Sequence, residues 1–444
     1  MKKKIVVVML LFMPFQMFAQ QMWNLKGCID YGLKNNRNSV IYENEKLAAD
    51  AKAKELLADY LPKLGLSGSL DDNLKVQQSV IPAGVFSPEP TRIAFTQKYN
   101  TNLTAQLDQT IFDQSLLTGL KANKYSKQQA DLNIEQSQET IIFNIGNAYY
   151  QIYVYREQLR LLRGNLDSYR KQMDAFRLQV DKGVTLKKDL DKVSVDYNNA
   201  MSQIRVAESN LTLSENQLKY EMGYPISDKL AIDSLSQQEA ASPPPISSFK
   251  FNFSAANRVD YRLSEVDLKL LEIDEKRIRA GALPKLTAYA RYGAVGFGQT
   301  LNPALTDLSG FSAIGLKLNF PIFDFFKRNA QVGQAKFKID NQVQTLKLNQ
   351  SKFQLEYENA RTKLQNAQNS IEQEKRNIAL AESVFQTTDL QFRKGITDLQ
   401  DWISAQNAIK DAQNNYLNSL YNFYQARLEL EKSGGTLKTF YTSL

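Results

Sequence analysis

The four residues "LPKL" occur twice in this chain, at Leu61–Leu64 and at Leu283–Leu286, 222 positions apart. Each copy ends a polar stretch of helical character and begins an alternating one, "LPKLGLSGSL" in the first case and "LPKLTAYARY" in the second. Alternation with a period of two is typical of a strand with one apolar face. The duplicated junction therefore predicts a chain built from two similar halves, each of which passes from a helix into a strand.

A second pair of matching stretches surrounds two glycines, Gly183 and Gly395, which lie 212 positions apart. The stretches are "VDKGVTLKKDLDKV" (Val180–Val193) and "FRKGITDLQDWISA" (Phe392–Ala405). Because glycine readily adopts the left-handed conformation that ends many helices, we expect each glycine at the tip of a hairpin of two long antiparallel helices. Thr185 and Thr397 are the predicted N-caps of the returning helices.

Apolar residues of the predicted helices recur every three and four positions, from Ile141 to Val180 in the first half and from Ile339 to Phe392 in the second. A sustained spacing of about 3.5 residues is typical of coiled-coil packing. The other positions are mostly Gln, Asn, Lys and Asp, so both broad faces of each helix are predicted to stay in water. The pattern favours a hollow wall of helices over a solid bundle.

Four stretches of the sequence alternate between apolar and polar residues. They are Leu64–Asp71, Thr101–Asp108, Leu286–Gly293 and Ala313–Phe320, joined in pairs by predicted outer loops at 72–92 and 297–310. A strand of about ten residues crosses a bilayer when it is tilted. About eight strands are needed to close a barrel, and a sheet in lipid cannot have open edges. The chain is therefore predicted to oligomerise, each copy contributing four strands to one wall.

The N-terminal stretch "MKKKIVVVMLLFMPFQMFAQ" places three lysines before an apolar core from Ile5 to Phe18. This is typical of a secretory signal, which we predict at 1–19, and the mature chain is then exported. No later apolar run reaches the eighteen residues expected of a membrane-spanning helix. Without the three lysines of the signal the formal net charge of +8 falls to +5, which is too weak and too evenly spread to indicate a nucleic-acid partner.

The composition argues against catalysis. Cys28 is the only cysteine and there is no histidine, so an internal disulfide, a cysteine metal cluster and a histidine base are all excluded. "LKGC" (Leu25–Cys28) has a faint likeness to a lipoprotein cleavage site, but a small buried residue on a helix is the favoured interpretation. No phosphate-binding loop or nucleophile motif is present. We predict no enzyme, cofactor or metal site.

Taken in order, these motifs resemble those of the TolC-type outer-membrane efflux proteins over nearly the whole mature length. The residues that carry the resemblance are both "LPKL" copies, "LDQTIFD" (107–113), "LNFPIFD" (318–324), the two "KG" tips, "EMGYP" (221–225) and "NLKGCIDYGLKNN" (24–36). The resemblance implies a mixed α/β membrane protein with an internal two-fold repeat. It also implies a homotrimer, whose twelve-stranded outer-membrane β-barrel continues into a periplasmic tunnel of twelve helices.

The resemblance also implies partners and a domain plan. The partners are a periplasmic adaptor that meets the tunnel tips, an inner-membrane efflux pump of the RND or ABC type, and outer-membrane lipid. After the signal peptide, the predicted parts are a first repeat at 20–239, a linker at 240–255 that includes "AASPPPISSF", and a second repeat at 256–444. The predicted location is the outer membrane of a Gram-negative bacterium, with a long periplasmic extension.

In this family, acidic residues after the tip glycine line the narrow periplasmic mouth. By position, Asp189 and Asp401 match, each six residues beyond its glycine. The second acid expected three residues later is Ser404 here, with Lys192 at the equivalent place in the first repeat, and Asp398 is a substitute source of charge. The ordinary alternative for each acid is a solvated residue in the first turn of a helix.

The tips are the predicted adaptor contacts. By the same resemblance these are Gly183, Val184, Gly395 and Ile396. The function that follows is a passive exit duct for drugs and other small molecules in a tripartite efflux system. Two alternatives stay open: the same duct serving type I protein secretion, and a periplasmic coiled-coil spacer without a pore.

Overall fold

The computed structural model describes residues 22–84, 88–94, 96–233 and 253–444. The predicted signal peptide at 1–19 lies outside the described residues, as does most of the predicted linker at 240–255. The chain divides into two compact units, which are described separately. Unit 1 contains residues 1–41, 135–259 and 350–444, and unit 2 contains residues 42–134 and 260–349. Each unit draws on both halves of the sequence.

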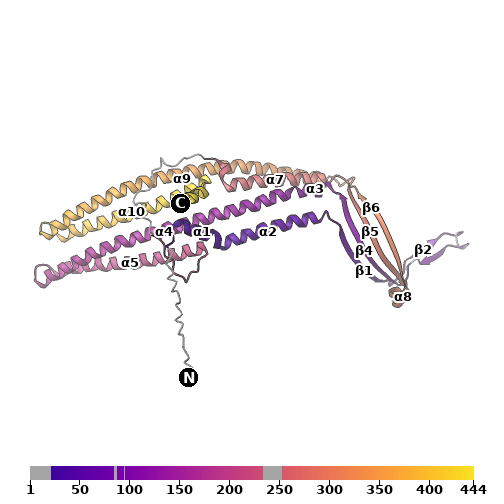
Figure 1. Ribbon diagram of the computed structural model, residues 1–444, viewed down its shortest axis with the longest axis horizontal. Helices are drawn as coiled ribbons and strands as arrows, with labels where there is room; N and C mark the ends of the chain where they lie inside the picture. Colours follow the sequence, from indigo (N-terminus) through magenta and orange to yellow (C-terminus); the bar gives the residue numbers. More distant parts are fainter. Residues whose placement is uncertain (1–21, 85–87, 95, 234–252) are drawn as a thin grey trace, which may run out of the picture. The chain divides into compact units, whose positions relative to one another are not determined.

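Four helical segments run side by side in unit 2, in the order α2, α4, α7, α9 (Figure 1). Their bounds are Arg37–Ala58 for α2, Ala122–Asp181 for α4, Val259–Ala280 for α7 and Lys327–Arg393 for α9, and the short α3 (Gln114–Leu120) precedes α4. Polar contacts fix the order: Lys127 Nζ lies 2.7 Å from Asp50 Oδ1, Gln129 Nε2 donates to Asp267 Oδ1 at 2.7 Å, and Gln342 Nε2 donates to the Ser264 carbonyl at 2.9 Å.

Unit 2 also contains the predicted strands, which form one antiparallel sheet in the order β1-β4-β5-β6. The strands are β1 (Lys63–Asp72), β4 (Tyr99–Phe112), β5 (Lys285–Gly298) and β6 (Leu308–Asn319). The strand prediction is confirmed, and all four strands are longer than the predicted alternating stretches, although β6 ends one residue before Phe320. The connection predicted at 72–92 holds β2 (Gln78–Ile81), which forms a second, two-stranded sheet with β3 (Thr91–Ala94), a strand that continues two residues past the predicted end. The connection predicted at 297–310 is shorter, because β5 ends at 298 and β6 begins at 308, and it holds a short helix, α8 (Leu301–Thr306).

The register of the sheet separates an apolar face from a polar one. Leu107 lies opposite Leu64 and Ala290, and Ala290 lies opposite Ile314, so one apolar row crosses all four strands. The Leu64 and Ile314 ends of this row are 77% and 89% exposed. The adjacent row, on the other face, includes Gly65, Gln106, Arg291 and Ala313. An apolar face this open, on a sheet whose outer strands are β1 and β6, is suited to a surface that is covered in the assembled protein.

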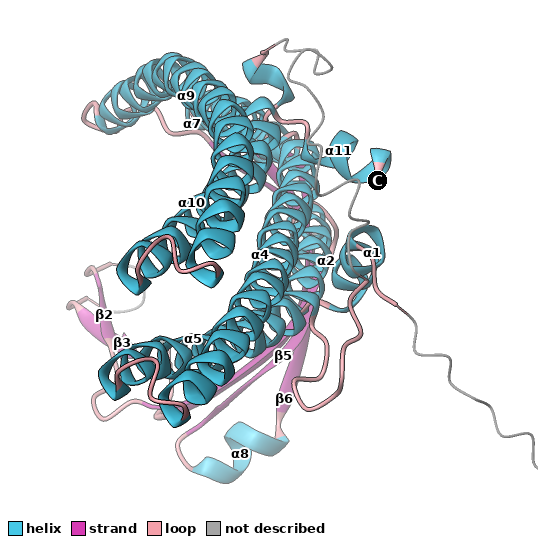
Figure 2. Ribbon diagram, turned by 90° about the vertical axis from the view of Figure 1, so that its left-hand side faces the viewer, coloured by secondary structure: helices cyan, strands magenta, loops and turns pink. Residues whose placement is uncertain are grey.

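Unit 1 is a wall of four helical segments in the order α5, α4, α10, α9 (Figure 2), with α5 spanning Lys187–Met222 and α10 spanning Leu399–Gly434. Its main core joins α4 to α10 through the stacked rings of Tyr150 and Tyr424, whose centroids lie 4.1 Å apart. The shorter helices α1 (Leu25–Asn35) and α11 (Leu437–Ser443) pack on this core. Cys28 is fully buried in α1, which confirms the interpretation of a small buried residue on a helix.

The internal repeat is visible in the helix ends. Both ends of α10 lie 212 positions after those of α5, and both helices close on a left-handed glycine, Gly223 with φ 69° and Gly435 with φ 70°. Both ends of α7 lie 222 positions after those of α2, the same offset as the two "LPKL" copies. The two halves therefore fold alike, as predicted.

The coiled-coil spacing is confirmed by burial. The buried seam positions are Ile141, Ile145, Ala148, Ile152, Leu159, Leu162, Tyr169 and Phe176 on α4, and Phe353, Tyr357, Ala360, Leu364, Ala367 and Ile371 on α9. In the described part of the chain, no eighteen-residue window of a helix is apolar enough for a membrane span.

Candidate functional site

The tips of the two helical hairpins have the same geometry. Gly183 and Gly395 both have φ +69°, and nothing lies within 4 Å of a Cβ built on either. The Val184 N–H donates to the Gln179 carbonyl at 2.8 Å, and the corresponding bond from Ile396 is 2.9 Å long. This six-to-one closure is the standard glycine helix end. Val184 and Ile396 project from the tips, 75% and 70% exposed.

The N-cap prediction for the returning helices is wrong by one residue in each hairpin. The N-cap of α5 is Leu186, which provides no side-chain bond, and the N-cap of α10 is Asp398. Asp398 Oδ1 accepts the Asp401 N–H at 2.9 Å, so an aspartate does the capping. The Thr397 hydroxyl is used differently, because it donates to the Asp401 carboxylate.

The predicted mouth residues fall into two unequal groups. Asp398, Asp401 and Ser404 lie together at the start of α10 and are exposed. Asp189 lies in the first turn of α5, its side chain is only 21% exposed, and its Oδ1 is 3.8 Å from the Lys192 ammonium. Lys192, which stands where a second acid was expected in the first repeat, thus partly compensates the negative charge of Asp189. The exposed carboxylates among the predicted mouth residues are therefore those of the second hairpin.

An aromatic cluster near the tips joins the long helical segments α4, α5, α9 and α10, and we call it the tip cluster. Its members are Tyr169 and Phe176 on α4, Val193 and Ala200 on α5, Leu399 and Trp402 on α10, and the flanking Phe385 and Phe392 on α9. The rings of Phe176 and Phe392 stack with centroids 5.6 Å apart, and Trp402 lies 6.2 Å from Tyr169 and 5.6 Å from Phe385. The two helical hairpins therefore pack against each other next to their tips.

Trp402 is the central residue of the tip cluster. It is 1% exposed, and its Nε1–H donates to Asp389 Oδ1 at 2.9 Å. Asp389 also pairs with Arg393 at 2.8 Å, so one carboxylate receives both a buried donor and a surface charge. Nearby on α5, burial raises the pKa of the Asp196 carboxyl, while the Lys410 ammonium lowers it.

Further from the tips, α4 and α10 share a buried polar contact. Asn165 Nδ2 donates to Gln413 Oε1 at 2.8 Å, and both residues are 8% exposed. The periodicity placed the tip-cluster members of α4 and α9 at apolar positions, but it gave no sign that both hairpins share one cluster. The periodicity also did not indicate the Asn165–Gln413 hydrogen bond, because in the sequence both residues look like the other polar residues of the solvent-exposed helix faces.

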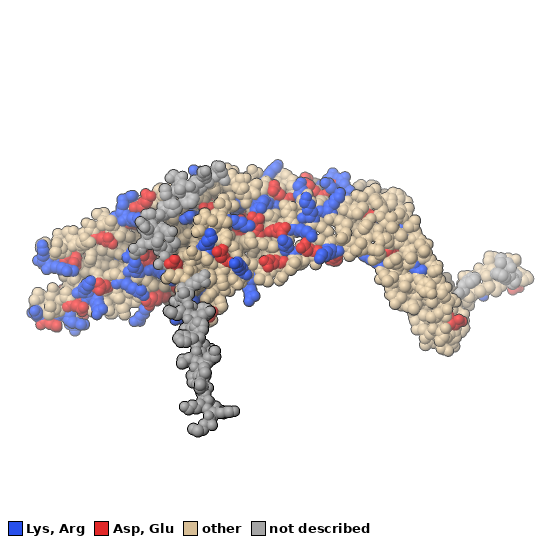
Figure 3. All heavy atoms as spheres, viewed as in Figure 1, with Lys and Arg blue, Asp and Glu red and all other residues tan. Residues whose placement is uncertain are grey.

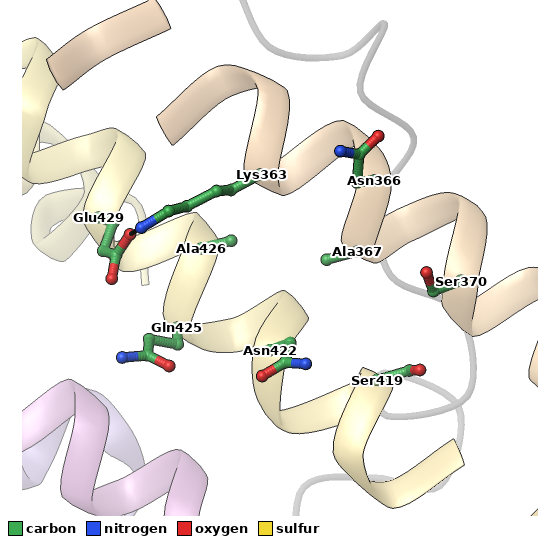
Figure 4. Close-up of a pocket in the computed structure, with 9 residues that line it drawn as sticks. All are labelled: Lys363, Asn366, Ala367, Ser370, Ser419, Asn422, Gln425, Ala426 and Glu429. Carbon is green, nitrogen blue, oxygen red and sulfur yellow. Dashed lines mark hydrogen bonds and ion pairs between the residues drawn. The ribbon is translucent and has the colours of Figure 1, made fainter. Parts of the chain in front are cut away.

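A polar groove of about 410 Å³ lies between α9 and α10 (Figure 4). Lys363 Nζ and Glu429 Oε2 form an ion pair of 2.9 Å within it. Its other lining residues are Asn366, Ala367, Ser370, Ser419, Asn422, Gln425 and Ala426. Small and amide side chains of this kind suit the approach of another polar helix. Among the described residues, no group of three or more His, Cys, Asp or Glu side chains could hold a metal ion.

An antiparallel sheet with an open apolar face, joined to long helical hairpins with polar surfaces, defines a class of outer-membrane channel proteins. Within that class, the chain belongs to the outer membrane efflux protein family, whose model matches residues 35–223 and 255–436. It is thus an outer-membrane efflux channel, as the resemblance implied, and a non-enzymatic transporter, as the composition predicted. The two matched segments correspond to the two halves of the repeat.

Curated relatives agree with this assignment. The chain is 23% identical over 401 residues to the outer membrane protein TolC of Salmonella enteritidis, a match that covers 88% of this chain and 77% of TolC. It is 22% identical over 343 residues to the alkaline protease secretion protein AprF of Pseudomonas aeruginosa, covering 75% of this chain and 69% of AprF. The fold matches a crystal structure of CusC with a TM-score of 0.74 at 16% identity, over 92% of this chain and 91% of that one.

Proposed function

We propose that three copies of this chain form the passive exit duct of a tripartite efflux system. The observation that carries the proposal is the sheet, which exposes an apolar row from Leu64 to Ile314 and leaves β1 and β6 at its edges. In lipid, unpaired edges carry unsatisfied backbone groups, so β6 of one copy has to pair with β1 of the next. Three copies supply twelve strands, enough for a closed barrel, whereas two supply only the minimum of about eight.

The partners proposed for the duct are a periplasmic adaptor and an inner-membrane pump of the RND or ABC type. The exposed Val184 and Ile396 at the glycine tips offer apolar contacts that the tips themselves do not use. We expect Gly395→Asp to abolish efflux while assembled copies persist, because it places a charge at the adaptor contact. Gly395→Asn is the matched control, because asparagine can adopt the left-handed conformation of this position and adds no charge. Normal drug resistance with Gly395→Asp rules the contact out.

The periplasmic mouth is proposed to be lined by Asp401, with Asp398 beside it. Rotational symmetry brings equivalent carboxylates together, which favours cations in the opening. Asp401→Ala should lower the cation preference of single channels in planar bilayers. Asp189→Ala should change it less, because Lys192 already compensates that charge, and Ser404→Asp should raise it. Equal effects of Asp401→Ala and Asp189→Ala contradict this assignment.

The cargo is proposed to be drugs and other small molecules. A passive duct takes its selectivity from its pump, and the family as described is one of efflux proteins. The alternative of type I protein secretion draws on the likeness to AprF, whose name describes protease secretion. A drug panel on a deletion strain, with parallel assay of secreted protein, separates the two. If the purified protein gives no conductance in planar bilayers, the spacer interpretation replaces both.

A further inference from the structure

A groove of about 760 Å³ lies between α7 and the start of the α3–α4 segment, in unit 2. Five cations line it: Lys121, Lys124, Lys269, Lys276 and Arg279. The only acid in its lining is Glu272. This excess of positive charge is local, because the neighbouring contacts of α4 with α2 are balanced ion pairs.

Only part of this charge is compensated by nearby acids. Lys269 pairs with Glu272 at 3.2 Å, and Arg279 pairs with Glu275. Within the described chain, Lys121, Lys124 and Lys276 have no acidic partner within 4 Å, and all three are exposed. Leu120, Ile273 and Ala280 supply apolar walls between them. The groove thus offers three uncompensated ammonium groups beside apolar surface.

The groove lies at one defined end of the four-stranded sheet. Phe112 at the end of β4 pairs with Leu286 at the start of β5, and α3 begins two residues after Phe112. Lys285 pairs with Asn319, so β6 ends at the same level. Figure 3 shows charged side chains gathered over the helices next to the sheet, whereas the sheet itself is almost free of them. The groove therefore begins where the apolar face stops.

Aromatic side chains mark the same level beyond β6. Phe323, Phe325 and Phe326 follow the strand, and Phe325 and Phe326 hold left-handed backbone with φ 49° and 63°. Their rings contact Phe323 at centroid distances of 4.7 and 5.8 Å, and all three are more than 60% exposed. Strained, exposed aromatic residues at the end of an apolar face are suited to a lipid–water boundary.

We propose that this cationic groove binds the phosphate of an anionic glycerophospholipid, in the leaflet on the helical side of the membrane. This rests on the proposed function, since it requires the sheet to be in the bilayer. The three free lysines face the phosphate, and the apolar walls contact the glycerol and the first acyl carbons. Long lysine stems allow this, because their methylenes lie on apolar surface while the ammonium reaches the headgroup.

Native mass spectrometry of the full chain in detergent tests the proposal, with dioleoyl-phosphatidylglycerol as the probe and dioleoyl-phosphatidylcholine as the neutral comparison. One lysine near an anionic surface contributes about fivefold to binding at low salt. The triple variant Lys121→Gln/Lys124→Gln/Lys276→Gln should therefore bind phosphatidylglycerol at least about tenfold more weakly, allowing for screening. The matched control Lys336→Gln/Lys338→Gln/Lys347→Gln removes the same charge from α9 of the same unit and should keep wild-type binding.

Three outcomes overturn the proposal: equal loss in both triple variants, no preference for phosphatidylglycerol over phosphatidylcholine, or full displacement of the lipid by millimolar inorganic phosphate. The last result indicates a free-phosphate site. Single-channel conductance of the same preparations separates this inference from the proposed function. If conductance is normal and the triple groove variant shows no selective loss of lipid binding, only the proposed lipid site is refuted. If the wild-type protein shows no conductance, the proposed duct function is refuted.

Discussion

Trp402→Ala should weaken the contact between the two helical hairpins at their tips without unfolding the rest of unit 1. The residue is fully buried in the tip cluster, which is separate from the larger core around Tyr150 and Tyr424. Replacing a buried Trp or Phe by Ala costs about 3–5 kcal/mol. At about 1.4 kcal/mol per factor of ten, this corresponds to roughly 140- to 3,700-fold in the equilibrium between joined and separated hairpins. Trp402→Phe keeps an aromatic ring but loses the bond to Asp389 and part of the buried volume, and should cost about 1.5–3 kcal/mol, less than Trp402→Ala.

The assay is hydrogen exchange read by mass spectrometry. Amides of the tip cluster helices, within 166–200 and 385–405, should exchange faster in Trp402→Ala, and those around 141–154 should keep the wild-type rate. Trp23→Ala is the matched control, because Trp23 packs against Tyr31 and Tyr224 in the other cluster. Single channels of Trp402→Ala should also show higher conductance. Unchanged exchange at the tips, or equal acceleration along the whole wall, refutes the role given to the tip cluster.

Three further predictions concern unit 1. Burial raises the pKa of Glu431, so the charged carboxylate destabilises the folded protein at pH 7. Glu431→Gln should therefore raise the melting temperature at pH 7. This gain should vanish near pH 4, where the carboxyl is largely protonated in both the folded and the unfolded chain. Gly183→Ala and Gly395→Ala should each cost about 1–2 kcal/mol in chemical denaturation, because both positions are left-handed. Gln413→Leu alone should cost about 1–3 kcal/mol, because it leaves the buried Asn165 amide without its hydrogen-bond acceptor. Replacing both Asn165 and Gln413 by Leu should be nearly neutral in the same assay.

The strands and hairpins could be predicted because their patterns are local. Alternation after each "LPKL" placed Leu64 and Leu286 on the apolar face, and the glycine tips needed only the freedom of a residue without a side chain. The offset of 212 residues then matched α5 to α10 at both ends. Repetition made these weak signals strong, since each half confirmed the interpretation of the other.

What the sequence did not show depends on side-chain geometry, in two cases within one helical turn and in a third over a long separation. The Lys192 ammonium offsets the negative charge of Asp189, one of the predicted mouth residues, and only the helical geometry of α5 reveals this pair. The Asp398 cap displaced the predicted Thr397 cap because a carboxylate competes well for the free N–H groups of a first turn. Of the groove lysines, Lys121 lies between α3 and α4, Lys124 lies in α4, and Lys269 and Lys276 lie in α7, more than 140 residues later, so no local pattern joins them.

The central claim is that an open four-stranded sheet requires three copies to share one closed wall. The most direct test is the mass of the assembly purified from outer membranes in detergent, measured by native mass spectrometry. The account predicts a particle of three chains that dissociates only when the detergent-resistant assembly is heated. A single chain that stays monodisperse in buffer without detergent would contradict it.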